Sequence, residues 1–166
     1  MLFRSSTFQN KYDFSSLSAS STVVVHIGTN ISLKVFESNA WIYIPSKSTN
    51  IYRIGCYSFA SEAMNSNIEG QSLYVELSDS TVNPINETLE FMNHHFGLAA
   101  QNIETISMST LKPAYVHFNA KAKSIVDGIK TELSAHDIYL TGRYGNWDYV
   151  SMEDCKIGRA SCRERV

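Results

Sequence analysis

The sequence predicts an α+β fold: an antiparallel sheet of five or six strands with two amphipathic helices. Short segments rich in β-branched and aromatic residues recur along the chain, as strands require. Two longer segments repeat apolar residues every three or four positions, which is the spacing of a helix with one buried face. With 166 residues, 43% of them hydrophobic and 18% charged, the chain can bury one moderate core, so one domain is the simplest expectation.

The predicted strands follow a serine-rich start. Residues 1–21 are polar and predict a mobile lead-in. Strands are predicted at residues 22–29, 41–44, 51–59, 73–78, 103–108 and 114–118. In the third of these, alternation puts Arg53 and Tyr57 on one face and Tyr52 on the other. Arg53 could therefore reach into a site, or it could be an ordinary surface arginine on an edge strand.

Residues 83–96 have the clearest helical pattern. Asn83 suits the N-cap, Pro84 the first helical position and Gly97 the C-cap. Residues 121–134 predict a second amphipathic helix, and a short apolar strand is predicted directly after it, at residues 137–140.

Charge, cysteine content and hydropathy argue against several protein classes. The formal net charge is -2 and no basic cluster occurs, which gives no support for nucleic-acid binding. Three cysteines do not make a disulfide framework and are expected to be reduced thiols of a cytoplasmic protein. No segment has the pattern of a signal peptide or approaches the ~20 apolar residues of a membrane span. His26, His94 and His95 have no set of further ligands near them in sequence, so no metal is predicted.

The most informative stretch is residues 141–154, TGRYGNWDYVSMED. Gly142 lacks a Cβ and can take a positive φ, which lets the backbone approach a ligand closely. Arg143 offers a fork of donors suited to a phosphate. Ser151 and Asp154 have the spacing of a capping box, and the helix that they begin would direct free backbone N–H groups at an anion.

The aromatic residues of this stretch leave two interpretations open. Tyr144, Trp147 and Tyr149 could line a pocket for a planar ring or a sugar. Equally, the stretch could be a turn whose arginine pairs with a nearby carboxylate and whose aromatic rings are half-buried packing, because short glycine motifs are weak evidence of function.

Residues 142–154 resemble the carboxyl-terminal flavin motif of the family that includes UDP-galactopyranose mutases, protoporphyrinogen-oxidase-like proteins and amine-oxidase-like FAD flavoproteins. Residues 41–58, WIYIPSKSTNIYRIGCYS, resemble a second segment of the same proteins. With residues 73–78 and 112–118, the likeness covers nearly all of residues 23–155 in the expected order. It implies FAD as the cofactor of an oxidoreductase or mutase that acts on a small-molecule substrate, for example a nucleotide sugar.

The resemblance implies roles for particular residues. Cofactor contacts would come from the glycine turn and the helix start: Gly142, Arg143, Gly145, Ser151, Met152 and Glu153. Substrate contacts would come from the sheet and the aromatic loop: Arg53, Tyr57, Tyr115, Trp147 and Tyr149. Residues 22–136 would form the substrate-side domain, and residues 137–155 the last strand of the FAD domain, its loop and the start of its helix. The resemblance assigns no catalytic residue.

Both ends of the sequence depart from the family pattern. The family begins with a strand and a G-x-G-x-x-G turn that holds the ADP half of FAD in a Rossmann-like, NAD(P)-binding type of domain, and no G-x-G occurs here. The chain would then be the carboxyl-terminal fragment of a larger two-domain flavoprotein and inactive without its amino-terminal FAD domain. Residues 156–166, KIGRASCRERV, resemble a translated sequencing adapter and are predicted to be a non-native tail.

A non-enzymatic function also stays open. A β-rich domain with an aromatic loop is compatible with a module that binds a carbohydrate or a nucleotide by stacking on its ring. Flavin absorbance of the complete protein separates the two hypotheses, because a binding module would purify colourless.

Overall fold

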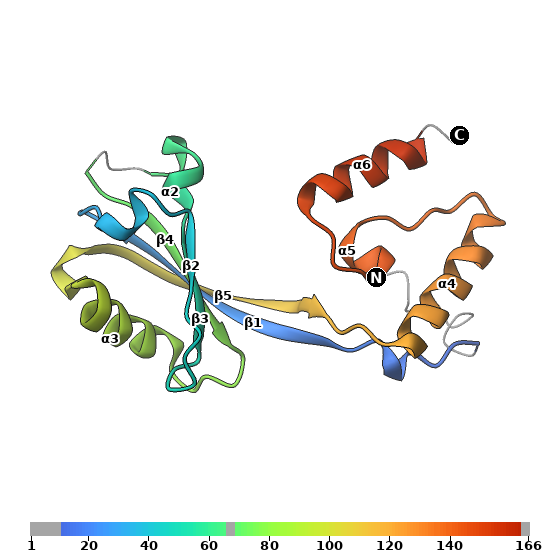
Figure 1. The fold of residues 1–166 in the computed structure, drawn as a ribbon, viewed down its shortest axis with the longest axis horizontal. Coiled ribbons are helices and arrows are strands. Elements are labelled where there is room, and N and C mark those ends of the chain that lie inside the picture. Colours follow the sequence, from blue (N-terminus) through green and yellow to red (C-terminus); the bar gives the residue numbers. More distant parts are fainter. Residues whose placement is uncertain (1–10, 66–68, 164–166) are drawn as a thin grey trace. The chain divides into compact units, whose positions relative to one another are not determined.

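The computed structural model describes residues 11–65 and 69–163, which form two compact units (Figure 1). Residues 21–112 make up one, the sheet unit, and the described parts of residues 1–20 and 113–166 make up the other, the helical unit. The described residues have a mixed α/β fold with a five-stranded antiparallel sheet, as predicted, and five α-helices instead of two.

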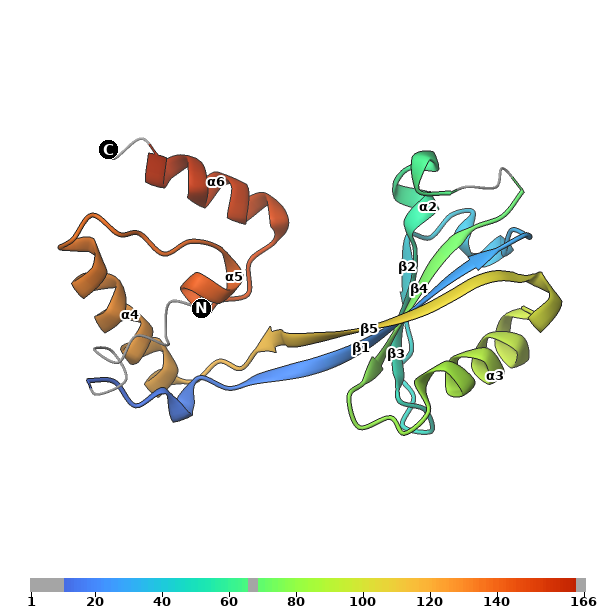
Figure 2. The ribbon, with the colours of Figure 1, turned by 180° about the vertical axis from the view of Figure 1, so that it is seen from behind.

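The sheet has the strand order β2-β3-β4-β1-β5. Its strands are β1 (Ala19–Thr29), β2 (Trp41–Tyr43), β3 (Ile51–Cys56), β4 (Ser72–Ser78) and β5 (Ile103–Val116). β1 and β4 are antiparallel neighbours in which Val25 pairs with Val75. β1 and β5 lie side by side in both views (Figure 1 and Figure 2), and the chain passes between the two units within these two strands.

One face of the sheet carries the hydrophobic core, and α3 (Pro84–Phe96) covers it. Alternate residues of β1 and β4 point to this face, so that Val25, Leu73 and Val75 are fully buried. Met92 of α3 packs against them and is also fully buried. Burying a side chain of this size contributes roughly 1.5–3 kcal/mol, which makes this layer the main source of stability in the sheet unit.

The ends of α3 are those predicted from the sequence. The Asn83 side chain accepts a hydrogen bond from the backbone of Asn86 at 3.5 Å. Gly97 has a φ of 68°, and its N–H and that of Leu98 return to carbonyls in the last turn. The bond from Gly97 to Asn93 is that of an αL motif, which needs a left-handed residue where the helix ends.

β5 replaces the two strands predicted at residues 103–108 and 114–118. Pro113 directly precedes the second of these predicted strands, but it lies inside β5. A proline lacks the backbone N–H, and β5 tolerates it because an edge strand needs hydrogen bonds on one side alone.

The prediction that Tyr52 lies on the opposite face from Arg53 is wrong. A β-bulge between Ile51 and Arg53 sets two residues of β3 against one residue of β4. The Tyr52 hydroxyl consequently lies 2.8 Å from Thr22 Oγ1, on the face away from the core. The predicted strand also ends early, because Tyr57 begins the short helix α2 (Tyr57–Ala60).

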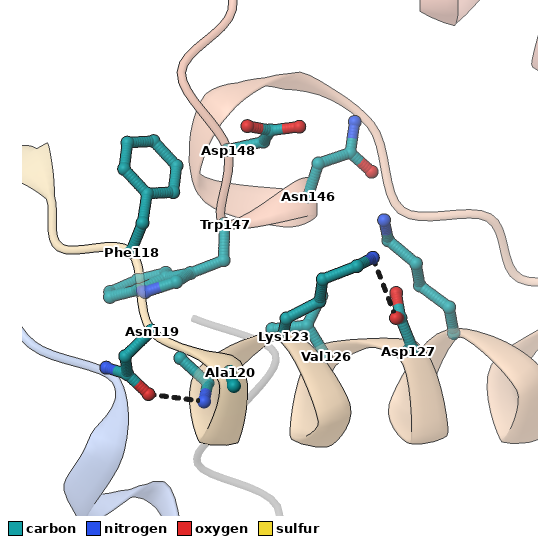
Figure 3. A pocket seen from close by; sticks show the side chains of 11 residues that line it. Phe118, Asn119, Ala120, Lys123, Val126, Asp127, Asn146, Trp147 and Asp148 are labelled. Carbon is teal, nitrogen blue, oxygen red and sulfur yellow. Dashed lines mark hydrogen bonds and ion pairs between the residues drawn. The ribbon is translucent and has the colours of Figure 1, made fainter.

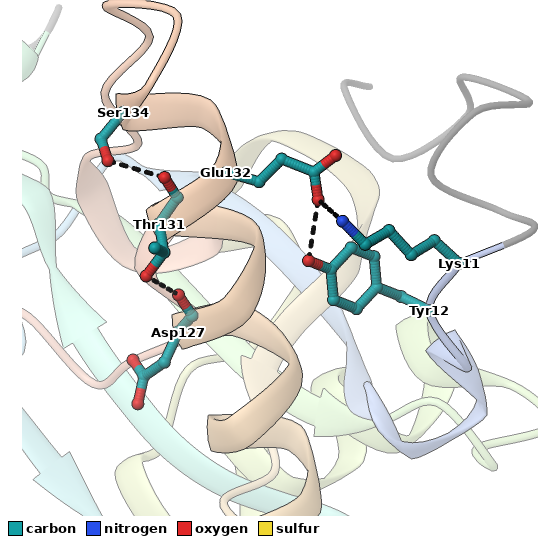
Figure 4. Close-up of polar contacts among 6 residues, drawn as sticks. All are labelled: Lys11, Tyr12, Asp127, Thr131, Glu132 and Ser134. Carbon is teal, nitrogen blue, oxygen red and sulfur yellow. Dashed lines mark hydrogen bonds and ion pairs between the residues drawn. The ribbon is translucent and has the colours of Figure 1, made fainter.

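The helical unit is built on α4 (Ala120–Ser134), the helix predicted at residues 121–134. Figure 4 shows Glu132 of α4 accepting hydrogen bonds from Lys11 Nζ at 2.6 Å and Tyr12 Oη at 2.9 Å. Lys121 forms an ion pair of 2.6 Å with Asp13. The described part of the predicted lead-in is therefore attached to α4, and residues 1–10 lie outside the described residues.

The strand predicted at residues 137–140 is not formed. α4 ends in a Schellman motif, in which the Ile138 N–H donates to Leu133 at 3.0 Å and the Asp137 N–H donates to Ser134 at 3.2 Å. Asp137 has a φ of 57°, so the chain turns sharply where the strand was expected to begin. None of the described strands pairs with these residues, and a strand needs such a partner.

Two further helices complete the helical unit: α5 (Gly142–Asn146) and α6 (Met152–Arg163). Short 3-10 turns occur at Phe14–Ser16, Lys34–Phe36, Glu62–Met64 and Ala100–Asn102. In the part of the chain that the structure describes, each helix is too short or too polar to cross a membrane.

Glu87, in the first turn of α3, ties the loop before β3 to this helix. Its carboxylate accepts hydrogen bonds from Thr49 Oγ1 (2.9 Å), the Asn50 backbone N–H (2.7 Å) and the Asn50 side-chain amide (3.0 Å). Burial alone would raise the pKa of Glu87, but these hydrogen bonds together outweigh it and hold the pKa below its ordinary value.

We predict that Glu87→Gln lowers the free energy of unfolding by about 1 kcal/mol at neutral pH. A carboxylate whose pKa is depressed by folding stabilises the protein above its ordinary pKa, and this contribution is lost as the pH falls through the folded-state pKa. Urea unfolding at neutral and acidic pH should show the gap between wild type and variant closing in acid. Glu90→Gln, at an exposed position of α3, is the control and should leave the free energy of unfolding unchanged at both pH values. A gap of equal size at both pH values would contradict the account.

Candidate functional site

The first candidate site is the glycine-arginine loop, residues 141–154, which contains α5 and the start of α6. Two left-handed residues lie at the ends of α5: Gly142 with a φ of 78° and Trp147 with a φ of 50°. A Cβ on Gly142 would meet its nearest neighbour, Cys155 Sγ, at an ordinary 3.7 Å. The backbone conformation, and not lack of space, therefore requires the glycine.

The chain reverses after α5 and returns to its first turn. The backbone N–H groups of Trp147 and Asp148 both donate to the carbonyl of Arg143, the second at 3.0 Å. Tyr149 then lies over the arginine side chain, with 4.7 Å between the guanidinium carbon and the ring centroid. The left-handed conformation of Trp147, which costs a non-glycine residue roughly 1–2 kcal/mol, makes this return possible.

Arg143 lies between two tyrosine rings. Its guanidinium carbon is 5.7 Å from the ring centroid of Tyr115 near the end of β5, in addition to the contact with Tyr149. Its Nη2 donates a hydrogen bond of 3.1 Å to the carbonyl of Val150. Among residues 11–65 and 69–163, no carboxylate forms an ion pair with Arg143. The structure therefore does not support the alternative in which this arginine pairs with a nearby carboxylate.

The capping box predicted at the start of α6 is confirmed. Ser151 Oγ accepts from the backbone N–H of Asp154 at 3.0 Å, and the Asp154 carboxylate accepts from the Ser151 backbone N–H at 2.8 Å. The hydrogen bonds from the Ser151 side chain and backbone lower the pKa of Asp154. The N–H groups of Met152 and Glu153 belong to the first turn, where a helix provides no backbone acceptor.

Trp147 lines a cavity together with residues of α4. The cavity has a volume of about 390 Å³, and its lining includes Phe118 and Lys123 (Figure 3). The pair of Lys123 and Asp127, 2.9 Å apart, adds charged groups to the same cavity. The buried indole Nε1 of Trp147 has no hydrogen-bond acceptor among the residues that the structure describes, which costs about 1–3 kcal/mol.

The second candidate site, the sheet-face pocket, has a volume of about 400 Å³ and lies on the sheet face away from α3. Its main polar and aromatic lining residues are His26, Trp41, Tyr57, Tyr74, Glu76 and Ser109. A hydrogen-bonded chain crosses it, because His26 Nε2 is 2.9 Å from Ser109 Oγ and His26 Nδ1 is 3.1 Å from Tyr57 Oη. Burial raises the pKa of the Tyr57 hydroxyl, which favours the protonated form of this hydroxyl.

Arg53 contacts the sheet-face pocket through one of its lining residues, Glu76, with which it forms an ion pair and which is 5% exposed. The guanidinium carbon is 5.9 Å from the ring centroid of Tyr74. Gly55 lies opposite Tyr74 in the ladder, and the absence of a Cβ there leaves room for the tyrosine ring. Arg53 is therefore held in place, and the carboxylate neutralises its charge.

The site residues that the resemblance predicted do not form one cluster in the structure. Tyr115 and Tyr149 lie with Arg143, Trp147 lines the cavity with residues of α4, and Gly145 lies inside α5. Arg53 and Tyr57 belong to the sheet unit. Sequence reasoning did not select the other polar residues of the sheet-face pocket: His26, Tyr74, Glu76 and Ser109. Strand alternation alone placed Tyr74 and Glu76 on one face, but register and strand order are needed to bring His26 and Ser109 beside them.

Two solved structures have a similar fold. One is a reduced UDP-galactopyranose mutase, with a TM-score of 0.68 and 20% identity over 86% of this chain and 31% of the mutase chain. The other is a putative protoporphyrinogen oxidase from Exiguobacterium sp. 255-15, with a TM-score of 0.65 and 14% identity over 90% of this chain and 35% of the oxidase chain. The chain thus spans about a third of the length of each. The predicted resemblance is confirmed at the level of the fold.

The sequence matches no protein-family model and no curated protein.

We predict that Gly142→Ala lowers the free energy of unfolding by about 1 kcal/mol, because alanine is strained at positive φ. Gly145→Ala is the matched control, three residues further along the same loop. Its Cβ would meet Leu140 at an ordinary 3.6 Å, and alanine favours a helix, so this change should be neutral or slightly stabilising. Urea unfolding followed by circular dichroism measures both. Equal effects of the two substitutions would show that the left-handed turn does not matter.

We predict that Arg53→Met destabilises the protein by about 3 kcal/mol, because it leaves the buried Glu76 carboxylate without its cation. The double substitution Arg53→Met with Glu76→Leu should recover most of this loss. At the exposed pair of α4, Lys123→Met should have far less effect on the free energy of unfolding, because solvent screens this pair. Urea unfolding of the four proteins measures these values, and a double variant no more stable than Arg53→Met would argue against the buried pair.

Proposed function

We propose that this chain is the substrate-side part of an FAD-dependent oxidoreductase or mutase, in which the glycine-arginine loop contacts the cofactor. One observation carries the proposal: Arg143 and the start of α6 lie on one short loop, in a fold shared with part of a mutase and part of an oxidase. The resemblance of residues 142–154 to a flavin motif supports the same assignment.

The chemistry of the loop fits the anionic part of FAD. The guanidinium of Arg143 has five N–H donors, and the hydrogen bond to Val150 uses one of them. The N–H groups of Met152 and Glu153 lie in the first turn of α6, where they carry the positive end of the helix dipole. The loop therefore combines a fixed cation with helix amides, two kinds of group that bind phosphate.

The proposed enzyme assigns a role in cofactor binding to the arginine, the two glycines and the helix start of the loop. Bound FAD would supply the redox chemistry. Arg143 would hold a phosphate, and Gly142 would let the backbone approach it, with Gly145 in the following turn. The first turn of α6, from Ser151 to Glu153, would stabilise negative charge on the reduced cofactor through its N–H groups.

The substrate side is assigned to the sheet-face pocket, whose volume of about 400 Å³ suits a small molecule. Tyr57 lines this pocket, and Arg53 contacts its lining residues Glu76 and Tyr74. Glu76 neutralises Arg53, so this arginine would orient a substrate through its N–H donors and not through net charge. Trp147 is a further candidate contact. The proposed substrate is of the amine-oxidase or the UDP-sugar-mutase class, and a nucleotide sugar is one candidate.

We further propose that an amino-terminal FAD domain, carrying the G-x-G-x-x-G turn that this sequence lacks, completes a cytoplasmic protein. The chain alone is then expected to hold FAD weakly and to be inactive.

We predict that the protein from the complete reading frame purifies yellow, with the visible absorption bands of an oxidised flavin. Arg143→Ala should weaken FAD binding by about tenfold or more, the effect of losing one charge-assisted contact. Arg143→Lys keeps the charge but loses the fork, and should fall between wild type and alanine. Titration of the apoprotein with FAD measures all three dissociation constants.

Two results would contradict this proposal. A colourless protein that does not bind added FAD would favour a non-enzymatic carbohydrate- or nucleotide-binding module. A yellow protein in which Arg143→Ala leaves the FAD dissociation constant unchanged would remove the phosphate role of Arg143 while keeping the flavin.

A further inference from the structure

Arg143 is held by contacts that leave its positive charge in place. Tyr149 and Tyr115 face the guanidinium with their rings, at 4.7 and 5.7 Å from the guanidinium carbon. An aromatic ring attracts a cation through its quadrupole and carries no charge of its own. Arg53 is the contrast, because Glu76 neutralises it in the sheet-face pocket.

The two rings come from different parts of the helical unit, and each has its own support. The backbone N–H of Tyr149 donates to the Asp148 carboxylate at 2.7 Å. Tyr115 lies near the end of β5, and the neighbouring carbonyl of Ala114 accepts a hydrogen bond of 3.2 Å from the Tyr144 hydroxyl. The second contact joins the loop to the strand, and Arg143 contacts one ring from each.

Fixing an arginine in advance matters for binding. A free arginine side chain loses rotamer freedom when it contacts a ligand, and this loss weakens binding. The two rings and the carbonyl of Val150 restrict Arg143 before any ligand arrives. A carboxylate would also restrict Arg143, but it would cancel the positive charge that attracts an anionic ligand.

We infer that Tyr115 and Tyr149 are positioning residues, which form an aromatic clamp that holds Arg143 as an un-neutralised cation for an anionic group. This inference rests on the proposed function for the identity of that group, a phosphate of FAD. It gives the two tyrosines a role through Arg143, in place of the direct contact with substrate that the resemblance implied. The rings are the essential part of the clamp, and the tyrosine hydroxyls are not.

The clamp is tested first without FAD, by NMR of the full chain with isotope-labelled arginine side chains. The Arg143 side-chain N–H signal, identified by its loss in Arg143→Lys, should be displaced upfield by ring currents. Tyr149→Phe keeps the ring and should keep the displacement, whereas Tyr149→Leu should remove most of it. Tyr139→Leu controls for loss of a tyrosine elsewhere in the helical unit. An undisplaced signal in the wild-type chain overturns the clamp.

FAD binding by the complete protein gives the second test. Tyr149→Phe should change the dissociation constant by less than about twofold, and Tyr149→Leu should raise it about three- to tenfold. In an Arg143→Ala background, Tyr149→Leu should have no further effect, because the tyrosine acts through the arginine. A purely structural role would instead weaken binding in both backgrounds, and that result overturns the inference.

The tests separate failure of the clamp from failure of the proposed function. If Arg143→Ala weakens FAD binding but Tyr149→Leu does not, the clamp is wrong and the phosphate role stands. If the signal is displaced and Arg143→Ala has no effect on FAD, the clamp holds and its proposed ligand is wrong. Should Tyr149→Leu fail to fold, the pair Tyr115→Phe and Tyr115→Leu gives the same comparison from the other ring.

Discussion

The left-handed backbone at Gly142 is the constraint on which the glycine-arginine loop depends. It lets the chain enter α5 directly after an extended residue, Thr141, and so sets the position of Arg143 in the first turn. A second left-handed residue, Trp147, ends α5 and returns the chain over the same arginine. The Tyr149 ring and the Val150 carbonyl reach the Arg143 guanidinium because the backbone turns twice within a few residues.

The two arginines of the candidate sites illustrate two ways of holding a buried or half-buried cation. Arg53 is paired with the Glu76 carboxylate, a lining residue of the sheet-face pocket, and this pair is neutral as a whole. Arg143 is held by aromatic rings and a carbonyl, which restrict it and leave its charge available. The ion pair of Arg53 suits hydrogen bonding to a neutral ligand, and the aromatic contacts of Arg143 suit binding of an anion.

Local patterns predicted much of this fold, and long-range contacts account for what they missed. The caps of α3 and the capping box of α6 follow from side chains within a few residues of each other, so the sequence displays them directly. The bulge in β3 depends on its pairing with β4, which no local pattern contains.

Longer-range placement explains the other differences. Pro113 looked like a strand boundary because nothing local shows that β5 lies at a sheet edge. The apolar residues before Thr141 looked like a strand, but the turn at Asp137 and the lack of a pairing strand among the described residues leave them irregular. For the site, the glycine turn and the arginine were visible in the sequence. The tyrosines were visible as residue types, but their position around Arg143 depends on the fold of the helical unit.

The most direct test of the central claim is a crystal structure of the complete protein with its flavin bound. The account predicts that phosphate oxygens of the cofactor lie within hydrogen-bond distance of the Arg143 guanidinium, with the first-turn amides of α6 directed at the same cofactor. A flavin bound elsewhere, with no contact to the glycine-arginine loop, would contradict the account.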